Sequence, residues 1–373
     1  MGKHLVLAGG GHAHMVTLQN LPQITKRGHQ VTVIGPSDFH YYSGMGPGML
    51  GGTYKPEEIR FKTRHVVEKY GCKFIREYIK KIDPQKKVVM LESGKTVSYD
   101  AVSFNVGSRV PRDILIEEGA PVFPVKPIEQ LHDAKQKVTG LLASSSEKNV
   151  ILSVVGGGPA ACEIAGNLFQ LAKRHGMKEP VIRVFAGKKL MAHFPDIIRR
   201  SAYKTLSDRG IEIIEQKYVS EIKQTAVMTD SGEAWPSDIV FLAIGVKPTP
   251  IFRKSVIETG PDGGLLVNRF LQSPQYPEIF GGGDCIYFKE KPLDKVGVYA
   301  VRENPVLFHN LLAFLEDRPL MPFDPGEEYL LIFNMGGGIG ILKKKWFFYQ
   351  GKGAFLLKDF IDRRFMKKFQ AIE

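Results

Sequence analysis

The chain has 373 residues, 43% of them apolar, which is enough to bury the cores of two or three domains. No uninterrupted apolar stretch approaches the roughly 20 residues that a membrane-crossing helix needs, and there is no low-complexity tract or solenoid-like repeat. The net charge of +12 favours an acidic partner, such as anionic lipid, nucleic acid or a phosphorylated cofactor. Because the basic residues are spread along the chain, charge alone does not choose among these.

The start of the chain and its cysteines indicate the compartment. The first expected strand begins at His4, without the charged, apolar and small-residue regions of a signal peptide before it. Three cysteines, Cys72, Cys162 and Cys285, fit a reducing compartment, and we expect each to be an inert, small apolar side chain. These features favour a cytoplasmic protein, and we expect no metal site.

The first strand, residues 4–8, is followed by Gly9-Gly10-Gly11-His12-Ala13-His14. Glycines at the end of a buried strand let the backbone turn tightly and let a pyrophosphate approach the next helix, so this turn is a candidate FAD site. A single glycine triplet also occurs in ordinary turns and bulges. Further strands are expected at residues 31–34, 73–75, 88–91 and 99–105, which form a nucleotide-binding domain that is interrupted near residue 110.

After an amphipathic helix between residues 126 and 148, a buried strand at 150–155 precedes a second run, Gly156-Gly157-Gly158-Pro159-Ala160-Ala161. Two such turns, each following a strand, indicate a flavoprotein with two dinucleotide sites. Strands expected at 181–185, 211–214 and 238–245 alternate with helices, which predicts parallel sheets and an α/β fold.

Residues 279–285 place Asp284 on a glycine-rich turn after another strand, and residues 298–315 are expected to be helical, so we interpret this segment as a return to the first domain. The carboxy-terminal segment differs, with strands expected at 328–333 and 345–349 and a helix at 355–369. The expected organisation is an FAD-binding domain at 1–110 and 250–320, an NAD(P)-binding-like domain at 111–249, and a small α+β module at 321–373.

Several motifs occur in an order that resembles a known flavoprotein superfamily. The two glycine turns, residues 105–108, residues 243–248 and Gly283-Asp284 follow one another as in the pyridine nucleotide-disulfide oxidoreductases, across essentially the whole chain. The chain resembles in particular the type II NADH dehydrogenases and sulfide:quinone oxidoreductases, and above all the flavoprotein module fused to selenide, water dikinase. The matching segments are residues 9–14, 42–48, 125–128, 298–302 and 358–366. The resemblance implies two Rossmann-like domains of the glutathione-reductase type.

By this resemblance the first domain binds FAD. The residues implied to surround the pyrophosphate form the first glycine turn: Gly9, Gly11, His12, Ala13 and His14, the last standing where the usual motif has a third glycine. Gly283 and Asp284 are implied to hold the ribityl chain, although Asp284 can also be read as a simple turn residue. Asn105 and Gly107 are implied to close over the adenine side.

The strand at 31–34 lacks the acid that usually binds the adenosine ribose. Ser37 or backbone groups are then expected to hold the ribose, while Asp38 either contributes or caps a turn.

The second glycine turn, with Gly156, Gly158 and Ala161, is the candidate site for NADH or NADPH. The strand that ends near Phe185 also lacks the acid typical of NADH sites. Lys188 and the adjacent Lys189 either pair with the 2′-phosphate of NADPH or are solvated surface lysines. A third alternative is that the second domain is only a scaffold and that the electrons come from another donor.

The resemblance also implies two residues close to the chemistry. Glu163, near the start of the helix that follows the second turn, matches a family position whose carboxylate points toward the flavin and the nicotinamide, where it would handle protons. Its other interpretation is a carboxylate favoured there by the helix dipole. Lys295 is implied to assist the helix starting near Tyr299, whose positive end would face the reduced flavin.

The cysteine pattern restricts the chemistry. The Cys-x4-Cys pair of the disulfide reductases in this superfamily is absent. Sulfide:quinone oxidoreductases need at least two cysteines near the flavin, and only Cys162 and Cys285 are candidates for such a pair.

The carboxy-terminal module interleaves basic and aromatic residues. Lys343-Lys344-Lys345 precedes the aromatic run at 346–349. The final helix is expected to place Leu357, Ile361 and Phe365 on one side, with Lys358, Arg363 and Lys367 outside. This arrangement suits an anionic membrane surface, where a quinone dissolves. A packed helix or a homodimer interface explains the apolar side equally well, and no nucleic-acid-binding module is recognised.

We therefore expect an FAD-dependent oxidoreductase that passes electrons from NAD(P)H or another reduced donor through the flavin to a quinone or similar small acceptor. Its expected location is the cytoplasm, at the inner face of the cell membrane. The alternatives are sulfide or selenium-related chemistry, and a flavin-bearing interaction protein with little turnover.

Overall fold

The first sheet has five parallel strands in the order β22–β9–β1–β2–β5. The computed structural model describes residues 2–111, 113–144 and 149–373. The strands are β1 (His4–Ala8), β2 (Gln30–Gly35), β5 (Lys73–Arg76), β9 (Ala101–Phe104) and β22 (Ile279–Gly281). Because β22 pairs with β9, the chain returns to its first sheet late in the sequence, as the Gly283-Asp284 motif led us to expect.

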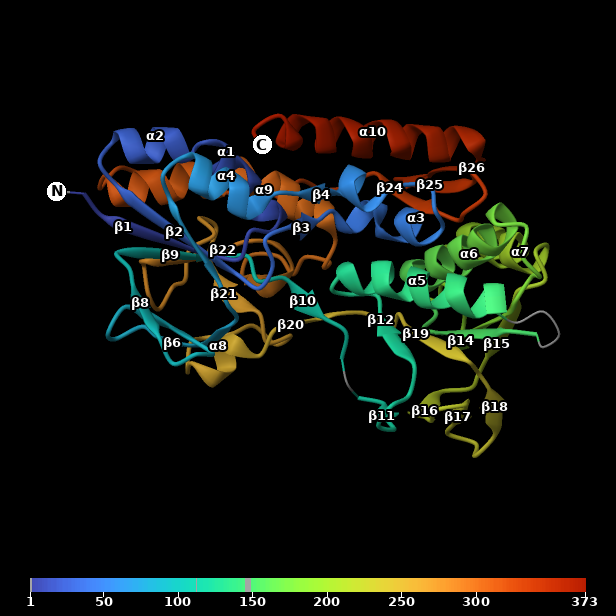
Figure 1. The fold of residues 1–373 in the computed structure, drawn as a ribbon. Helices are drawn as coiled ribbons and strands as arrows, with labels where there is room; N and C mark the ends of the chain where they lie inside the picture. Colours follow the sequence, from blue (N-terminus) through green and yellow to red (C-terminus); the bar gives the residue numbers. More distant parts are fainter. Residues whose placement is uncertain (1, 112, 145–148) are drawn as a thin grey trace.

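Layers on both faces cover this sheet, with helices above it and a small sheet below it in Figure 1. The helices are α1 (Met15–Gln19), α2 (Leu21–Lys26), α4 (Thr63–Lys69) and α9 (Gly297–Leu315). The layer below contains antiparallel β6 (Ile79–Asp83), β7 (Val88–Leu91) and β8 (Thr96–Ser98), with α8 (Ile251–Lys254). Coverage on both sides explains why β1 and β9 are nearly continuous apolar runs.

The second sheet is also parallel, in the order β12–β19–β13–β14–β15. Its strands are β12 (Val122–Pro124), β13 (Ile151–Val155), β14 (Val181–Gly187), β15 (Glu212–Glu215) and β19 (Ile239–Leu242). Its helices are α5 (Glu129–Ser144), α6 (Pro159–Arg174) and α7 (Asp196–Ser207). Residues 145–148, at the end of the segment where we expected the helix α5, lie outside the described residues. A smaller sheet joins β11 (Leu115–Ile116), β16 (Val219–Ile222), β17 (Ala226–Thr229) and β18 (Ala234–Pro236).

Short elements connect the two parts. Antiparallel β10 (Ser108–Arg109) and β20 (Lys247–Pro248) pair where the chain passes between the sheets. The other short elements are α3 (Gly46–Leu50), the pair β3 (His40–Tyr41) and β4 (Arg60–Phe61), and the pair β21 (Leu265–Val267) and β23 (Ile286–Phe288). The predicted α/β fold with parallel sheets is confirmed, whereas the exact domain limits stay predictions.

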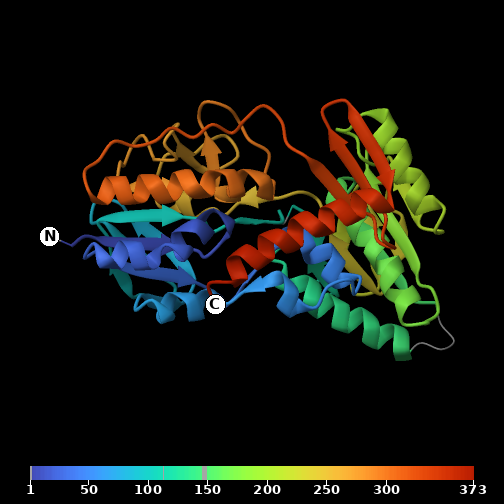
Figure 2. The same cartoon turned by 90° about the horizontal axis from the view of Figure 1, so that it is seen from above.

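The carboxy-terminal module consists of antiparallel β24 (Leu331–Asn334), β25 (Gly340–Lys344) and β26 (Phe347–Gly351), followed by α10 (Lys352–Gln370). Figure 2 shows α10 crossing from the second part of the molecule to the first. The predicted division of α10 into an apolar and a basic side is partly wrong. Lys358 pairs with Asp362 in the interior, while Leu357 and Ile361 are each 40% exposed. Within the described residues, no helix is long and apolar enough to cross a membrane.

Candidate dinucleotide-binding site

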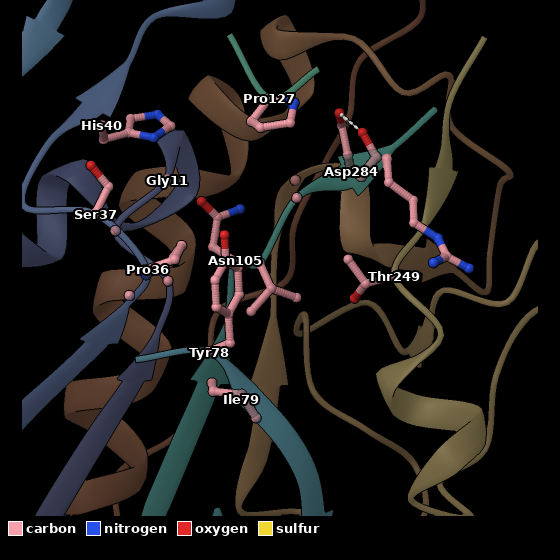
Figure 3. A pocket seen from close by; sticks show the side chains of 18 of the residues that line it. Gly11, Pro36, Ser37, His40, Tyr78, Ile79, Asn105, Pro127, Thr249 and Asp284 are labelled. Atoms are coloured by element: carbon pink, nitrogen blue, oxygen red, sulfur yellow. Dashed lines mark hydrogen bonds between the residues drawn. The ribbon is translucent and has the colours of Figure 1, made fainter. Parts of the chain in front are cut away.

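A cavity of about 510 Å³ lies at the carboxyl ends of the first sheet, where parallel sheets of this kind bind their ligands. The ends of four strands and the residues after them line it: residues 9–12 after β1, residues 34–37 at the end of β2, residues 105–109 after β9, and residues 283–284 after β22. Figure 3 shows Tyr78 and Ile79 at one end, and Pro127 and Asp284 toward the other. The cavity is therefore elongated and runs across the carboxyl ends of these strands.

Glycine is required at two places in the first turn. Gly9 has a left-handed φ of +94°, and a Cβ on it would lie 2.2 Å from the Asn105 carbonyl oxygen. A Cβ on Gly11 would lie 2.0 Å from Oδ1 of the Asn105 side chain. That oxygen accepts a hydrogen bond from the Ala13 N–H at 3.3 Å, and Asn105 Nδ2 donates to the Gly282 carbonyl at 2.6 Å. Asn105 thus joins the turn after β1 to the turn after β22.

Asp284 presents a carboxylate at the cavity wall. Lys126 Nζ lies 2.5 Å from Asp284 Oδ2, and the Ser108 hydroxyl donates to the same oxygen at 2.7 Å. Burial alone would raise the pKa of Asp284, but Lys126, the Ser108 hydroxyl and His12 together outweigh burial and hold that pKa below its ordinary value. Sequence reasoning noted the motif that contains Lys126 but expected no role for this side chain.

Three residues that line the cavity carry buried polar atoms without partners among the described residues. His12 Nδ1 lies 3.1 Å from Nε2 of His40, and burial lowers the pKa of His12 to about 4, so this ring is neutral near pH 7. His12 Nε2 and the hydroxyls of Thr63 and Thr249 have no hydrogen-bond partner among the described residues, and all three residues line the cavity. Each of these three atoms is itself covered by protein, so none of them is exposed to the cavity.

Three site residues predicted in the FAD-binding domain do not line the cavity. Ala13 contributes only indirectly, because its N–H donates to Asn105, which does line the cavity. His14 lies behind the turn, where its ring nitrogens contact the Gly9 carbonyl oxygen at 2.6 Å and the Ser103 hydroxyl at 2.8 Å. Lys295 pairs with Asp262 at 2.8 Å. Within the structure, His14 and Lys295 therefore support the backbone around the site.

The end of the cavity near Tyr78 contains acids that sequence reasoning missed. Ser37 and Gly107 line the cavity, whereas Asp38 does not line it and lies 3.4 Å from Arg76. Glu77 and Glu92, which directly follow β5 and β7, line the cavity instead. No strand-end motif marks either glutamate, so no signal in the sequence distinguished them.

The second glycine turn is more open. Gly156 has a φ of +139°, and a Cβ on it would lie 2.2 Å from the Ala243 carbonyl oxygen, whereas a Cβ on Gly158 would meet no atom within 4 Å. Ala161 is buried in α6. Lys188 is exposed and pairs with no acidic side chain among the described residues, whereas Lys189 lies 3.8 Å from Asp196.

Glu163 lies on α6 but does not line the cavity. Its Oε1 accepts a hydrogen bond from the Asn334 N–H at 2.8 Å, at the end of β24. Burial raises the pKa of Glu163 to about 7, against the opposing effect of nearby Lys358. Lys358 itself pairs with Asp362 at 2.6 Å, and Tyr42 donates to Asp362 at 3.1 Å. Glu163 therefore belongs to a buried polar cluster beneath α10.

The cysteines are buried thiols. Burial raises the pKa of Cys72 to about 11, and those of Cys162 and Cys285 to about 12. A thiol with such a pKa is almost entirely protonated near pH 7 and is a poor nucleophile.

Comparisons with known proteins identify the family. The model of the pyridine nucleotide-disulphide oxidoreductases matches residues 3–306. A type II NADH:quinone oxidoreductase of Staphylococcus saprophyticus is 23% identical, and the match covers 99% of this chain and 96% of that protein. A demethylphylloquinone reductase of Synechocystis is also 23% identical, and the match covers 90% of this chain and 87% of that protein.

Solved structures share the fold over the whole chain. The sulfide:quinone oxidoreductase of Aquifex aeolicus has a TM-score of 0.81 at 19% identity and covers 100% of this chain and 92% of its own. The type II enzyme NDH2 of Plasmodium falciparum, solved with NADH, has a TM-score of 0.82 at 13% identity, with 100% and 97% covered. The particular resemblance to the module fused to selenide, water dikinase stays a prediction. The chain belongs to the pyridine nucleotide-disulphide oxidoreductase family.

Proposed function

We propose that this protein is an FAD-dependent oxidoreductase that passes electrons from NAD(P)H to a quinone-type acceptor. The observation that carries the proposal is the cavity at the first sheet, where the glycine turns after β1 and β22 and an ionised Asp284 surround one elongated space. Its volume of about 510 Å³ lies within the usual range for cofactor and ligand sites.

The residues present fit FAD. Gly9, Gly10 and Gly11 line the cavity, and a glycine backbone lets a pyrophosphate approach closely. The carboxylate of Asp284 would accept hydrogen bonds from the ribityl hydroxyls, with Lys126 fixing its charge and orientation. Ser37 and Glu77 would hold the adenosine end. Bound FAD would supply two-electron transfer between donor and acceptor.

The electron donor and acceptor are inferred from the second turn and from the relatives. The open approach at Gly158 suits a dinucleotide that exchanges, and the unpaired Lys188 favours the 2′-phosphate of NADPH. Quinones are named for the Staphylococcus and Synechocystis proteins, and an alternative NAD(P)H-ubiquinone oxidoreductase of Arabidopsis thaliana is 23% identical over 85% of this chain. The buried, protonated thiols of Cys162 and Cys285 do not favour sulfide chemistry.

The carboxy-terminal module supports binding at an anionic membrane surface in the cytoplasm. Its exposed apolar side chains are Trp346, Phe347, Tyr349, Leu356, Leu357, Phe360 and Ile361. Lysines 343–345 precede the first of these, and Arg363, Arg364, Lys367 and Lys368 follow the last. Apolar side chains flanked by cations match a surface that enters the headgroup region, where quinones are available. A homodimer contact through the same side chains is the competing arrangement.

An anaerobic absorbance titration of the flavin tests the proposal. Bleaching of the bound flavin by NADPH or NADH, followed by recovery on adding a soluble quinone, is the expected result. Bleaching by sulfide alone would replace the nicotinamide donor with sulfide. If no donor bleaches a stoichiometric flavin, the flavin-bearing interaction protein becomes the better description.

A further inference from the structure

Two adjacent side chains of α9 lie beneath the candidate pocket. Glu303 and Asn304 are each only 1% exposed, although acidic residues are rarely buried without a partner. Neither residue lines the cavity, and neither was singled out in the sequence. Their partners explain their burial.

Glu303 holds the turn after β22. Its Oε2 accepts a hydrogen bond from the Gly283 N–H at 2.5 Å, directly before Asp284. A Cβ on Gly282 would lie 3.0 Å from this oxygen and 2.7 Å from the Ala13 Cβ, so the two turns and Glu303 are packed tightly. Among the described residues, no basic side chain forms an ion pair with Glu303.

Asn304 holds the other turn. Its Oδ1 accepts a hydrogen bond from the Val16 N–H at 2.7 Å, and its Nδ2 donates to the His12 carbonyl oxygen at 2.5 Å. Consecutive side chains of one helix thus fix both backbone segments that border the cavity. Because both side chains project from one helix, these bonds tie the two segments to a common support.

We propose that Glu303 and Asn304 act as positioning residues that fix the spacing of the two turns, and that the charge of Glu303 regulates the affinity for the dinucleotide pyrophosphate. This inference rests on the proposed binding of FAD. A pyrophosphate seated between the turns brings negative charge close to the carboxyl group of Glu303. A neutral Glu303 therefore favours binding, and an ionised Glu303 opposes it.

The surroundings place the change of charge in the physiological range. Burial raises the pKa of Glu303 to about 7, the Gly283 N–H lowers it, Asp284 raises it and Lys295 lowers it. Asp284 stays ionised and His12 stays neutral near pH 7, so neither changes charge there. FAD affinity should be highest below pH 7 and should fall as the pH rises through 7. If binding raises this pKa by about one unit, the loss approaches tenfold.

The experiment measures the dissociation constant of FAD for the deflavinated full-length protein between pH 5.5 and 8.5. Glu303→Gln retains an oxygen acceptor for the Gly283 N–H, so we expect tight binding that does not weaken with pH. Glu303→Ala loses both the contact and the charge, so it should bind FAD about tenfold more weakly than Glu303→Gln at every pH. Glu278→Gln is the control, because Glu278 is also a buried glutamate, only 7% exposed, and does not line the cavity. It should keep the wild-type pH profile.

A second measurement does not depend on FAD. Backbone amide exchange in the deflavinated protein should accelerate about tenfold at residues 281–285 in Glu303→Ala and at residues 12–17 in Asn304→Ala, while Glu303→Gln matches wild type. Unchanged exchange would overturn the positioning role, and a wild-type pH profile in Glu303→Gln would overturn the regulatory one. A wild-type protein that takes up no FAD would refute the proposed function and the regulation together, while the exchange result would still decide the positioning role.

Discussion

The two glycine turns have nearly the same backbone and different surroundings. Gly11 and Gly158 occupy equivalent positions, with φ/ψ of −74°/−176° and −91°/−175°. Around Gly11 the side chain of Asn105 fills the space that a Cβ would need, whereas a Cβ on Gly158 would meet no atom within 4 Å. Similar local sequences thus form an enclosed turn in one place and an open turn in the other. The enclosure comes from residues that are distant in the sequence.

Alanine at the two equivalent glycines tests this difference most strongly. In Gly11→Ala the new Cβ displaces Asn105, which loses its hydrogen bonds to Ala13 and Gly282. We expect FAD affinity to fall by about a hundredfold, because two lost hydrogen bonds cost about 3 kcal/mol. Gly158→Ala should leave FAD binding within about twofold and raise the KM for the nicotinamide instead. Flavin-to-protein absorbance ratios and melting temperatures measure this, and equal FAD loss in both variants would contradict it.

The ion pair between Lys126 and Asp284 is expected to make the next largest contribution, in this case to the stability of the fold around the enclosed turn. Lys126→Met leaves a buried carboxylate without its cation, which should lower the free energy of unfolding by about 2 kcal/mol. This loss is smaller than for breaking a fully buried ion pair, because the Lys126 side chain is 24% exposed. The control is Lys247→Met, whose pair with Asp113 is exposed and should contribute less than about 1 kcal/mol. Denaturant unfolding of the two variants makes the comparison.

The pH dependence gives an independent readout of the same pair. The pKa of Asp284 is lowered in the folded protein, so the pair contributes stability at neutral pH that is lost as the pH falls through the lowered pKa. Wild type should therefore lose more stability than Lys126→Met on acidification below the ordinary pKa of an aspartate. Parallel acid unfolding curves for the two proteins would show that Lys126 does not stabilise the carboxylate.

The local features of the site were predictable, and its enclosure was not. Gly9, Gly11 and Asp284 are marked by strand-end motifs, because a turn that brings backbone close to a ligand needs glycine at fixed positions. Lys126 lies 158 residues from Asp284 in the sequence, so no spacing rule relates them. Helical periodicity assigns Lys358 to the solvent side, but its ion pair with Asp362, four residues later on the same helix, holds it in the interior.

The choice of nicotinamide depends on the open turn. Lys188→Glu should reduce kcat/KM for NADPH relative to NADH by about tenfold, because it replaces an unpaired cation with an anion near the expected 2′-phosphate. Lys189→Glu is the control, since Lys189 already faces Asp196 at 3.8 Å, and it should shift the ratio less. A ratio that is insensitive to both changes would place the adenosine ribose elsewhere and would weaken the assignment of this turn.

The smallest change in affinity is expected at the exposed face of α10, which is distant in sequence from both glycine turns. Leu356→Ser with Phe360→Ser removes apolar side chains that are 63% and 61% exposed. Binding to vesicles of phosphatidylglycerol should weaken about fivefold, since two partly inserted side chains contribute about 1 kcal/mol. Leu115→Ser, at a residue 72% exposed on β11, is the matched control and should bind like wild type. Flavin content should stay unchanged in all three proteins, because these side chains do not line the cavity. If the α10 variant instead dissociates a dimer and keeps its vesicle binding, the apolar face is a subunit contact.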